Sequence, residues 1–504
     1  MDLRITKYSH YFAVFAYTAK GAQFRREFTN RFIEMALVKK RGRFMNAPTR
    51  TYARRDLKKE ETCFHINSFA DFIKEAEKYQ WSGVKYDLVE VPMYEPTKVK
   101  FKGEIAPWEN QVPVIEFGSS PGIQKVITAQ PGFGKTLCSL AIAKENGTRF
   151  ATVTLGGYED RWIPEFYDKL GLKPDEVRSC CGCTKLYRLL REVKTKGFKK
   201  VKAIFISNGA LRDFYKNWNN GKVVGSGCED IDPATLWEYL GVGLVIIDEA
   251  HKEVHSHFIG DLYSHVPKKI YLTATLFSKQ QFMLDMYEMM MPRRLRKEGG
   301  KINKYVDVVK VVYNLKDWRK AKYIGGQGSY SHTTYEQWIM ADKDRKRNYT
   351  EAIYEYADNV WYKGRKSEHK LLVFASTIDL CQHFSHTFSK KWPELKVNSF
   401  TSGDDYQTLL DSHVIFSTLG KSGTAVDIPD LTQAILTVAV DSPNANIQAL
   451  GRLRELKGEK AFKQTYHCFV CNNIDKHIDY WKGKERLFSG RITGTSTAHL
   501  DRVI

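Results

Sequence analysis

The stretch "VITAQPGFGKTLCSLAIA", residues 126–143, decides how the rest of the sequence is interpreted. An apolar run enters a loop with two glycines and a Lys-Thr pair, and a pattern typical of a helix follows. A loop of the form Gly/Ala-x4-Gly-Lys-Ser/Thr turns successive backbone N–H groups toward a phosphate at a helix N-terminus. The alternative is a glycine turn that happens to end in Lys-Thr. The strand before it and the helix after it favour a phosphate-binding loop.

The residues of this loop have the types that nucleotide binding needs. Ala129 opens the loop, and Gly132 and Gly134 permit its tight backbone path. We expect Lys135 to reach the β- and γ-phosphates, and Thr136 to place its hydroxyl on Mg²⁺. ATP and Mg²⁺ are therefore the expected cofactors.

A second apolar run, "GLVIIDEAH" at residues 243–251, supplies acidic groups for such a site. Asp248 and Glu249 stand at the carboxyl end of the expected strand, 113 residues after Lys135. Open α/β sheets bind ligands at that edge. We expect Asp248 to hold Mg²⁺ through water and Glu249 to polarise the attacking water.

Short β-branched runs alternate with longer amphipathic stretches around these motifs, and the scheme repeats in the second half of the chain. Apolar strands separated by helices indicate parallel sheets that are covered on both faces. The expected strands lie within residues 124–130, 149–155, 201–207, 243–250 and 268–275, and then within 370–377, 395–401, 412–418, 433–440 and 465–471.

The composition points to a polyanionic partner. The 504 residues include 78 Lys and Arg against 58 Asp and Glu, a formal net charge of +20. Residues 1–60 alone hold fifteen basic and five acidic residues by direct count, with aromatic residues between them. Such a surplus favours nucleic acid as the partner. A solvated basic surface with no dedicated role is the alternative for this front segment.

The cysteines and the apolar runs exclude other classes of protein. The clusters "CCGC" at 180–183 and "CFVC" at 468–471 lack the spacing of zinc ribbons or fingers, so we expect free thiols in a reducing compartment. The apolar run at 11–17 is too short for a signal or a membrane segment. We therefore expect an intracellular protein without a membrane partner.

Taken in order, the motifs resemble those of the superfamily 2 helicases and translocases. Asp-Glu-Ala-His at 248–251 resembles motif II of that family, and Gln111 in "PWENQ" resembles the Q motif that reads adenine. A Gln amide matches the donor and the acceptor of the adenine edge with two hydrogen bonds. Thr273 and Thr275 in "LTATL" resemble motif III, which couples the ATP site to the bound strand.

The second half of the chain continues the resemblance. "LLVFAST" at 371–377 resembles motif IV. "STLGKSGTAVDIP" at 417–429 resembles motif V, which implies nucleotide contacts at Gly423 and Asp427 and places Thr418 in the same motif.

The last motif departs from the family pattern. "NIQALGRLRE" at 446–455 resembles motif VI with Gln448, Gly451 and Arg452. The family has Gln-x-x-Gly-Arg-x-x-Arg, whereas this chain has Arg454 one place early and Glu455 in the last position. The resemblance implies an arginine finger from this motif. We expect both arginines to be needed, and which of them faces the phosphate stays open.

The resemblance implies an α/β fold: two tandem RecA-like parallel-sheet lobes preceded by a small basic α+β domain. We expect an N-terminal DNA-binding domain at 1–95, an ATP-binding lobe at 96–295, a connecting region at 296–345 and a second lobe at 346–504.

The chain looks most like the phage branch-migration helicases. This implies an ATP-dependent DNA helicase that unwinds or branch-migrates forked and four-way DNA in replication, recombination or repair. Such a protein is expected to be a monomer in the cytoplasm, with little sequence preference. The alternatives are a double-strand translocase, an RNA helicase, or a nucleic-acid-binding protein with an inactive nucleotide site. The intact Lys135, Thr136, Asp248 and Glu249 argue against the last.

Overall fold

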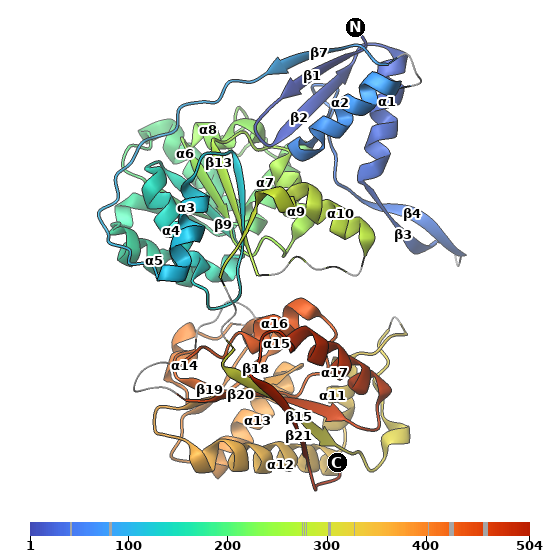
Figure 1. Cartoon of the computed structure of the whole chain (residues 1–504), viewed down its shortest axis with the longest axis vertical. Helices are drawn as coiled ribbons and strands as arrows, with labels where there is room; N and C mark the ends of the chain where they lie inside the picture. Colours follow the sequence, from blue (N-terminus) through green and yellow to red (C-terminus); the bar gives the residue numbers. More distant parts are fainter. Residues whose placement is uncertain are drawn as a thin grey trace. The chain divides into compact units, whose positions relative to one another are not determined.

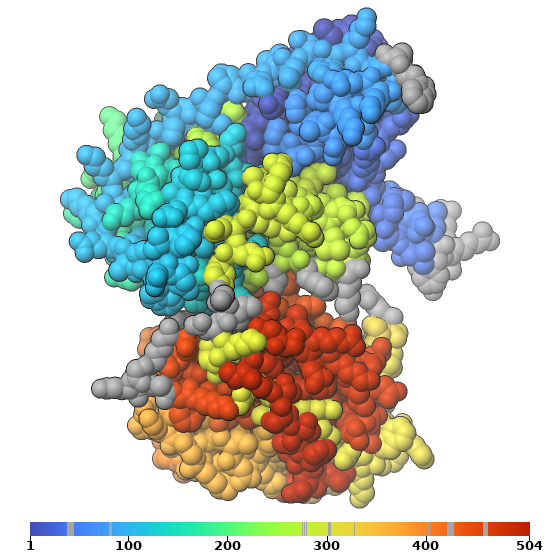
Figure 2. Space-filling view, in the orientation of Figure 1, coloured from blue at the N-terminus to red at the C-terminus, as the bar shows by residue number. Residues whose placement is uncertain are grey.

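The chain forms two compact units, Met1–Gly300 and Lys301–Ile504, which are described separately. Figures 1 and 2 show the computed structural model coloured along the sequence. It describes residues 1–40, 43–79, 83–274, 276, 278, 280–300, 304–326, 328–401, 403–422, 428–456 and 462–504, without the side chains of 38–40, 43, 44, 421 and 422.

The first unit begins with a small α+β domain, as predicted. Its sheet consists of β1 (Leu3–Lys7), β2 (Tyr11–Ala16), β5 (Arg54–Asp56), β6 (Glu61–His65) and β7 (Tyr86–Glu90), and its helices are α1 (Ala19–Thr29) and α2 (Phe69–Lys78). The strand order is β5-β6-β2-β1-β7, and only β1 and β7 pair in parallel. Phe28 of α1 lies 4.9 Å from Phe72 of α2 and 5.2 Å from Phe64 of the sheet, ring centre to ring centre. The aromatic residues of the front segment therefore form the core of this domain.

A separate two-stranded sheet extends from this domain. The antiparallel strands β3 (Ile33–Lys40) and β4 (Arg43–Thr51) pair with each other and with no other named strand of the described residues. Figure 1 shows this hairpin projecting from the body of the first unit.

The rest of the first unit is a seven-stranded sheet with the order β10-β11-β9-β12-β13-β8-β14, in which all pairs are parallel. The inner strands are buried on both faces, which explains their continuous apolar sequences. The strands are β8 (Gln124–Thr128), β9 (Phe150–Thr154), β10 (Val177–Cys180), β11 (Ala203–Ser207), β12 (Leu244–Ile247), β13 (Lys268–Thr273) and β14 (Arg296–Glu298). The helices are α3 (Val112–Ser119), α4 (Lys135–Asn146), α5 (Glu159–Leu170), α6 (Cys183–Lys196), α7 (Asn208–Asn219), α8 (Leu236–Tyr239), α9 (Val254–Asp261) and α10 (Gln281–Met290).

The segment between the front domain and this sheet runs along the sheet domain. Thr97 N–H donates to Gly241 O at 3.0 Å, Val99 N–H to Gly147 O at 2.9 Å, and Gly103 N–H to Leu170 O at 3.0 Å. One continuous apolar cluster includes buried residues of both the front domain and the sheet domain. The front domain is therefore packed onto the sheet domain.

The second unit repeats the architecture. Its seven-stranded parallel sheet has the order β17-β18-β16-β19-β20-β15-β21. The strands are β15 (Val306–Tyr313), β16 (Lys370–Ala375), β17 (Val397–Phe400), β18 (Val414–Thr418), β19 (Leu431–Leu436), β20 (Gln464–Cys471) and β21 (Gly494–His499). The helices are α11 (His332–Met340), α12 (Lys343–Val360), α13 (Ile378–Lys391), α14 (Tyr406–Asp411), α15 (Leu419–Ser422), α16 (Pro443–Leu450) and α17 (Asp475–Phe488).

All ten predicted strands are present in the two seven-stranded sheets, which contain four others: β10, β14, β15 and β21. Of the added strands, β14 reads Arg-Lys-Glu and β21 reads "GTSTAH", and both are edge strands without a continuous apolar run. The stretch expected as a connecting region at 296–345 contributes β14 to the first sheet, and β15 and α11 to the second unit.

The described residues contain neither a helix long and apolar enough to cross a membrane nor a His, Cys, Asp and Glu cluster that could hold a metal. The cysteines are free, as predicted, and seven of the nine are buried. Segment 11–17, apolar in sequence, provides the buried strand β2 of the front domain. Its apolar character therefore reflects the core.

Candidate functional site

The predicted phosphate loop lies between β8 and α4 of the first unit. Gly132 and Gly134 have φ values of 92° and 85°, in the left-handed region that favours glycine. The helix begins at Lys135 directly after Gly134. The first N–H groups of a helix have no partner within it, so the loop presents donors and the positive end of the helix dipole to a ligand.

The ammonium group of Lys135 lies within its own loop. Its Nζ donates to Ala129 O at 2.9 Å and to Gln130 O at 3.2 Å. The side chain therefore spans the loop from its last residue to its first, next to the backbone that would surround a phosphate. Ala129 contributes its carbonyl to this arrangement.

Gln111 is buried against the same loop. Its Nε2 donates to Phe133 O at 2.7 Å, and its Oε1 accepts from Trp108 N–H at 2.8 Å. A Cβ atom at Gly134 would stand 2.3 Å from Gln111 Nε2. The amide of Gln111, which the resemblance to the Q motif assigns to adenine, thus also holds the loop backbone. Glycine is required at position 134 for this contact.

Thr136 and Asp248, the two residues predicted to serve Mg²⁺, share one neighbouring cation. Arg161 on α5 donates from Nη2 to Thr136 Oγ1 at 3.2 Å. Burial raises the pKa of Asp248, and the Glu249 carboxylate raises it further, while Arg161 and then Lys135 act in the opposite direction. Two oxygen donors and two cationic side chains therefore gather at the carboxyl ends of β8 and β12.

Arg161 belongs to none of the sequence motifs. An arginine two residues into an amphipathic helix has the appearance of an ordinary surface residue, and only the fold brings α5 beside the loop. Trp162, the next residue, is fully buried and donates from Nε1 to Asp248 Oδ2 at 3.2 Å. This hydrogen bond orients the carboxylate, which also accepts from Glu249 N–H at 2.9 Å.

Glu249 adopts a φ of 52°, which is uncommon for a residue with a side chain and concentrates at functional sites. Its Oε2 lies 3.4 Å from His251 Nδ1, and the same nitrogen lies 3.0 Å from Thr273 Oγ1. The Asp-Glu-Ala-His segment is thereby joined to the end of β13, where Thr273 also accepts from Ala129 N–H at 3.0 Å.

The predicted residues of the second unit that the structure describes lie at the end of β18 and in or directly after α16. Thr418 is the last residue of β18, and Gln448 lies near the end of α16, which follows β19. Arg452 Nε donates to Gln448 O at 3.1 Å, and Arg454 O accepts from Gln464 Nε2 at 2.9 Å.

Gly451 ends α16 with an N–H donated to Ile447 O at 2.9 Å. Gly423 and Asp427 of the second unit and Thr275 of the first lie outside the described residues.

A buried carboxylate fixes the end of β16 in the second unit. Glu336 on α11 accepts from Ser376 N–H at 2.7 Å, from Thr377 N–H at 2.8 Å and from Thr377 Oγ1 at 2.9 Å. These donors belong to the segment that resembles motif IV. Trp338, Trp361 and Trp392 of this unit are buried in the core.

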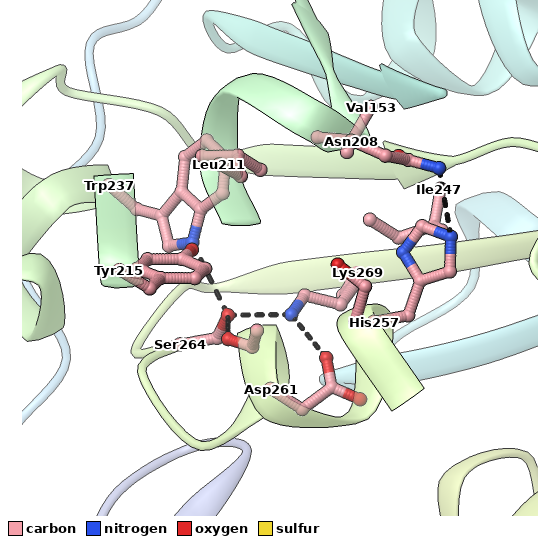
Figure 3. Close-up of a pocket in the computed structure, with 12 residues that line it drawn as sticks. Val153, Asn208, Leu211, Tyr215, Trp237, Ile247, His257, Asp261, Ser264 and Lys269 are labelled. Atoms are coloured by element: carbon pink, nitrogen blue, oxygen red, sulfur yellow. Dashed lines mark hydrogen bonds and ion pairs between the residues drawn. The ribbon is translucent and has the colours of Figure 1, made fainter. Parts of the chain in front are cut away.

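A second polar cluster lies next to β12 and β13 of the first sheet, around a cavity with room for about one water molecule (Figure 3). Lys269 of β13 donates to Asp261 Oδ1 and to Ser264 Oγ, both at 2.7 Å. Tyr271 donates to Asp261 Oδ2 at 2.7 Å, and His65 Nε2 of the front domain lies 3.3 Å from the same oxygen. The cluster joins the front domain to the sheet domain and is too confined for an organic ligand.

Comparisons with known proteins show the fold. No known protein family and no curated protein matches the sequence. Among solved structures, Mss116p bound to ssRNA and AMP-PNP superposes with a TM-score of 0.51 at 13% identity, over 77% of this chain and 74% of that chain.

Two further solved structures match less closely. Saccharomyces cerevisiae Dbp5 bound to RNA and ADP BeF3 gives a TM-score of 0.49 at 9% identity, over 78% of this chain and 90% of its own. The Pyrococcus furiosus Hef helicase domain gives 0.41 at 13% identity, over 75% and 98%.

The superposition on Mss116p, together with the two parallel seven-stranded sheets, establishes the fold class. The chain has two tandem RecA-like lobes preceded by a small α+β domain, as the sequence predicted.

Proposed function

We propose that this chain is an ATP-dependent superfamily 2 DNA helicase that unwinds or branch-migrates forked and four-way DNA. One observation carries the proposal: Lys135, Thr136, Asp248 and Glu249 gather at the carboxyl edge of the first sheet, around a loop shaped for a phosphate. Each of these residues has the type that phosphoryl transfer requires at its position.

The residues present fit a magnesium ion. Thr136 Oγ1 and the Asp248 carboxylate are hard oxygen donors, and the cation Arg161 already lies beside them. Bound Mg²⁺ would neutralise charge on the β- and γ-phosphates. Lys135 would bind the same phosphates, the loop N–H groups would orient them, and Glu249 would accept a proton from the attacking water.

The second lobe would supply positive charge to the same triphosphate. Gln448, Arg452 and Arg454 lie in or directly after α16 of that lobe, and we propose that one arginine stabilises the γ-phosphoryl oxygens during transfer. Gly423 and Asp427 would contact nucleotide in the same lobe, and Gln111 would bind adenine in the first. Nucleotide binding and release would then move one lobe against the other.

The proposal of DNA as the partner rests on charge and on the front domain. Contacts to the phosphate backbone hold a strand without reading its sequence, so a motor can use them at every step. The net charge of +20 and the fifteen basic residues among the first sixty suit such contacts. Phosphate contacts alone do not distinguish DNA from RNA, so the test below includes both.

The test is the rate of ATP hydrolysis with single-stranded, duplex, forked and four-way DNA and with RNA, at one salt concentration. We expect forked and four-way DNA to stimulate hydrolysis most strongly. Stimulation by RNA alone would identify an RNA enzyme, and hydrolysis with duplex DNA but no strand separation would identify a translocase.

Lys135→Ala should abolish the stimulated hydrolysis while DNA affinity stays within about threefold, because the substitution removes the group that holds the phosphates. Lys199→Ala is the matched control, since Lys199 is an exposed lysine of the same unit and its removal should change neither quantity. Normal hydrolysis by Lys135→Ala would refute the assignment of the site. Absence of hydrolysis by the unaltered chain with every nucleic acid and Mg²⁺ would refute the proposed function.

A further inference from the structure

The described part of the β3–β4 hairpin carries exposed apolar side chains. Met35, Leu37 and Met45 expose 55%, 65% and 49% of their surface. An isolated two-stranded hairpin is only marginally stable in water, and its open edges and apolar side chains are a liability unless something covers them. The hairpin therefore has the properties of a binding element.

The sequence of the hairpin indicates which partner covers it. Residues 33–51 contain five Lys and Arg and one acidic residue by direct count. Lys39, Lys40 and Arg43 lie at the end of the hairpin farthest from its base, where Lys40 pairs with Arg43. Positive charge at the tip combined with exposed Met and Leu matches a polyanion that also offers apolar surface. A nucleic-acid duplex has both features, at its phosphates and at its base steps.

The base of the hairpin is anchored on two helices of the ATP-binding lobe. Tyr52, which follows β4, is fully buried, and its ring centre lies 4.9 Å from His255, 5.1 Å from Phe258 and 5.5 Å from Phe282. His255 Nε2 donates to Thr51 O at 2.8 Å. Helix α9, which carries His255 and Phe258, begins three residues after the Asp-Glu-Ala-His segment.

The second anchoring helix follows β13. Phe282 belongs to α10, and Tyr52 also donates its hydroxyl to Met283 Sδ of that helix at 3.3 Å. The hairpin therefore rests on the two helices that leave the carboxyl ends of β12 and β13. A shift of either strand end at the nucleotide site would be transmitted to the hairpin through packed side chains.

We propose that the β3–β4 hairpin is an arm that grips B-form duplex DNA and follows the state of the nucleotide site through α9 and α10. The major groove of B-form DNA admits a two-stranded ribbon, whereas the major groove of an RNA duplex is too narrow. Duplex DNA is therefore the partner that the hairpin fits.

The experiment measures affinity for a DNA duplex, for either of its single strands and for an RNA duplex of the same sequence, without nucleotide. One variant replaces residues 37–46 with Asn-Gly, which joins the paired residues Ala36 and Ala47 by a two-residue turn. A second variant combines Lys39→Ala, Lys40→Ala and Arg43→Ala. The matched control combines Lys74→Ala, Lys78→Ala and Lys85→Ala, which removes equal charge from exposed positions of the same domain.

We expect both hairpin variants to lose about tenfold or more in affinity for duplex DNA and less than threefold for the other two ligands. The slope of log affinity against log salt should fall by about 3 in the triple variant, since each phosphate contact contributes about 0.9. Equal losses on single strands, a comparable loss on the RNA duplex, or the same loss in the control would overturn the proposal.

The coupling has its own measurement. The Asn-Gly variant should keep its hydrolysis rate without nucleic acid and lose most of the stimulation by duplex DNA, at DNA concentrations that saturate binding. Unchanged stimulation at saturating DNA would refute the coupling between the hairpin and the nucleotide site, but not DNA binding by the hairpin. The inference takes its partner from the proposed function, but the affinities are measured without ATP. A chain that binds duplex DNA through the hairpin but does not hydrolyse ATP would therefore refute the proposed helicase activity and not the proposed role of the hairpin in DNA binding.

Discussion

Single residues at the proposed nucleotide site tolerate little substitution. Gly132 and Gly134 have positive φ values, and Gln111 closes over Gly134 so tightly that a side chain there would displace the amide. The glycines that define the motif in the sequence are thus explained by backbone conformation and by one close contact. Arg161 also contacts this site, through Thr136 Oγ1, although it lies outside the motif.

Arg161→Ala should lower the Mg²⁺ concentration needed for half-maximal ATP hydrolysis by about threefold or more. The guanidinium contacts Thr136 Oγ1 and lies near enough to Asp248 to oppose the rise in its pKa, so it competes with a metal for the same two groups. One exposed charge a few ångströms away accounts for an effect of this size. The measurement is a titration with Mg²⁺ at fixed ATP.

Arg161→Lys is the control for this titration, since it keeps the charge and should stay close to the unaltered chain. Suppose instead that Arg161→Ala leaves the Mg²⁺ requirement unchanged or raises it. The arginine would then serve the phosphates and would not compete with the metal.

At the scale of secondary-structure elements, the pair Lys269–Asp261 joins β13 to the end of α9. Both side chains are fully buried, with a separation of 2.7 Å between Nζ and Oδ1. Burial opposes ionisation of Asp261, but Lys269 and His65 outweigh it and hold the pKa of that carboxyl below its ordinary value. The pair lies inside the first unit, where it also fixes Ser264.

Lys269→Met should destabilise the first unit by about 3–5 kcal/mol, because it leaves a buried carboxylate without its cation. Combining it with Asp261→Asn should cost less than the two single substitutions together, since both charges are then absent. Unfolding in urea, followed by tryptophan fluorescence, measures both effects. If the loss for Lys269→Met stayed below 1 kcal/mol, the pair would not hold these elements together.

The whole molecule consists of two units, and the front domain belongs to the first. Its core is continuous with that of the sheet domain, and His65 reaches Asp261 across the junction. Removal of residues 1–95 would therefore expose a core and leave Asp261 short of a partner. Shortening the hairpin avoids this, because the described side chains of its outer half are exposed.

Acid should destabilise both units through buried histidines, among them His257 in the first unit and His467 in the second. Burial lowers the pKa of His257 in the first unit to about 4 and that of His467 in the second to about 3. His257 Nε2 accepts from Asn208 Nδ2, and His467 Nδ1 accepts from the hydroxyl of Tyr356, so both rings must be neutral. An unfolded histidine titrates near 6.5. The stabilisation is therefore complete above pH 6.5 and is lost as the pH falls toward 4 and 3.

Each histidine should contribute at most about 1.4 kcal/mol per pH unit in that window. Urea unfolding at a series of pH values between 7 and 4.5 measures the slope. His467→Gln should flatten the slope of the second unit, whereas substitution of the exposed His386 by Gln should not. A slope that His467→Gln leaves intact would assign the acid sensitivity to other groups.

The sequence by itself determined the two sheets and the glycine loop between β8 and α4. Strands buried on both faces must be apolar throughout, and a phosphate loop must have glycines and a lysine at fixed positions. The strands and the loop can therefore both be predicted without a structure. Of the four strands of these sheets that it did not reveal, β10, β14 and β21 are edge strands, whose open side removes the need for an apolar sequence.

Only the tertiary structure placed Arg161 beside Thr136, enclosed Gln111 under the loop and set the β3–β4 hairpin on the helices that follow β12 and β13. These contacts join residues that lie far apart along the chain, and no local pattern encodes such contacts. In the sequence, Arg161 and Tyr52 look like any other arginine and tyrosine, and the position of Gln111 under the loop follows only from the fold.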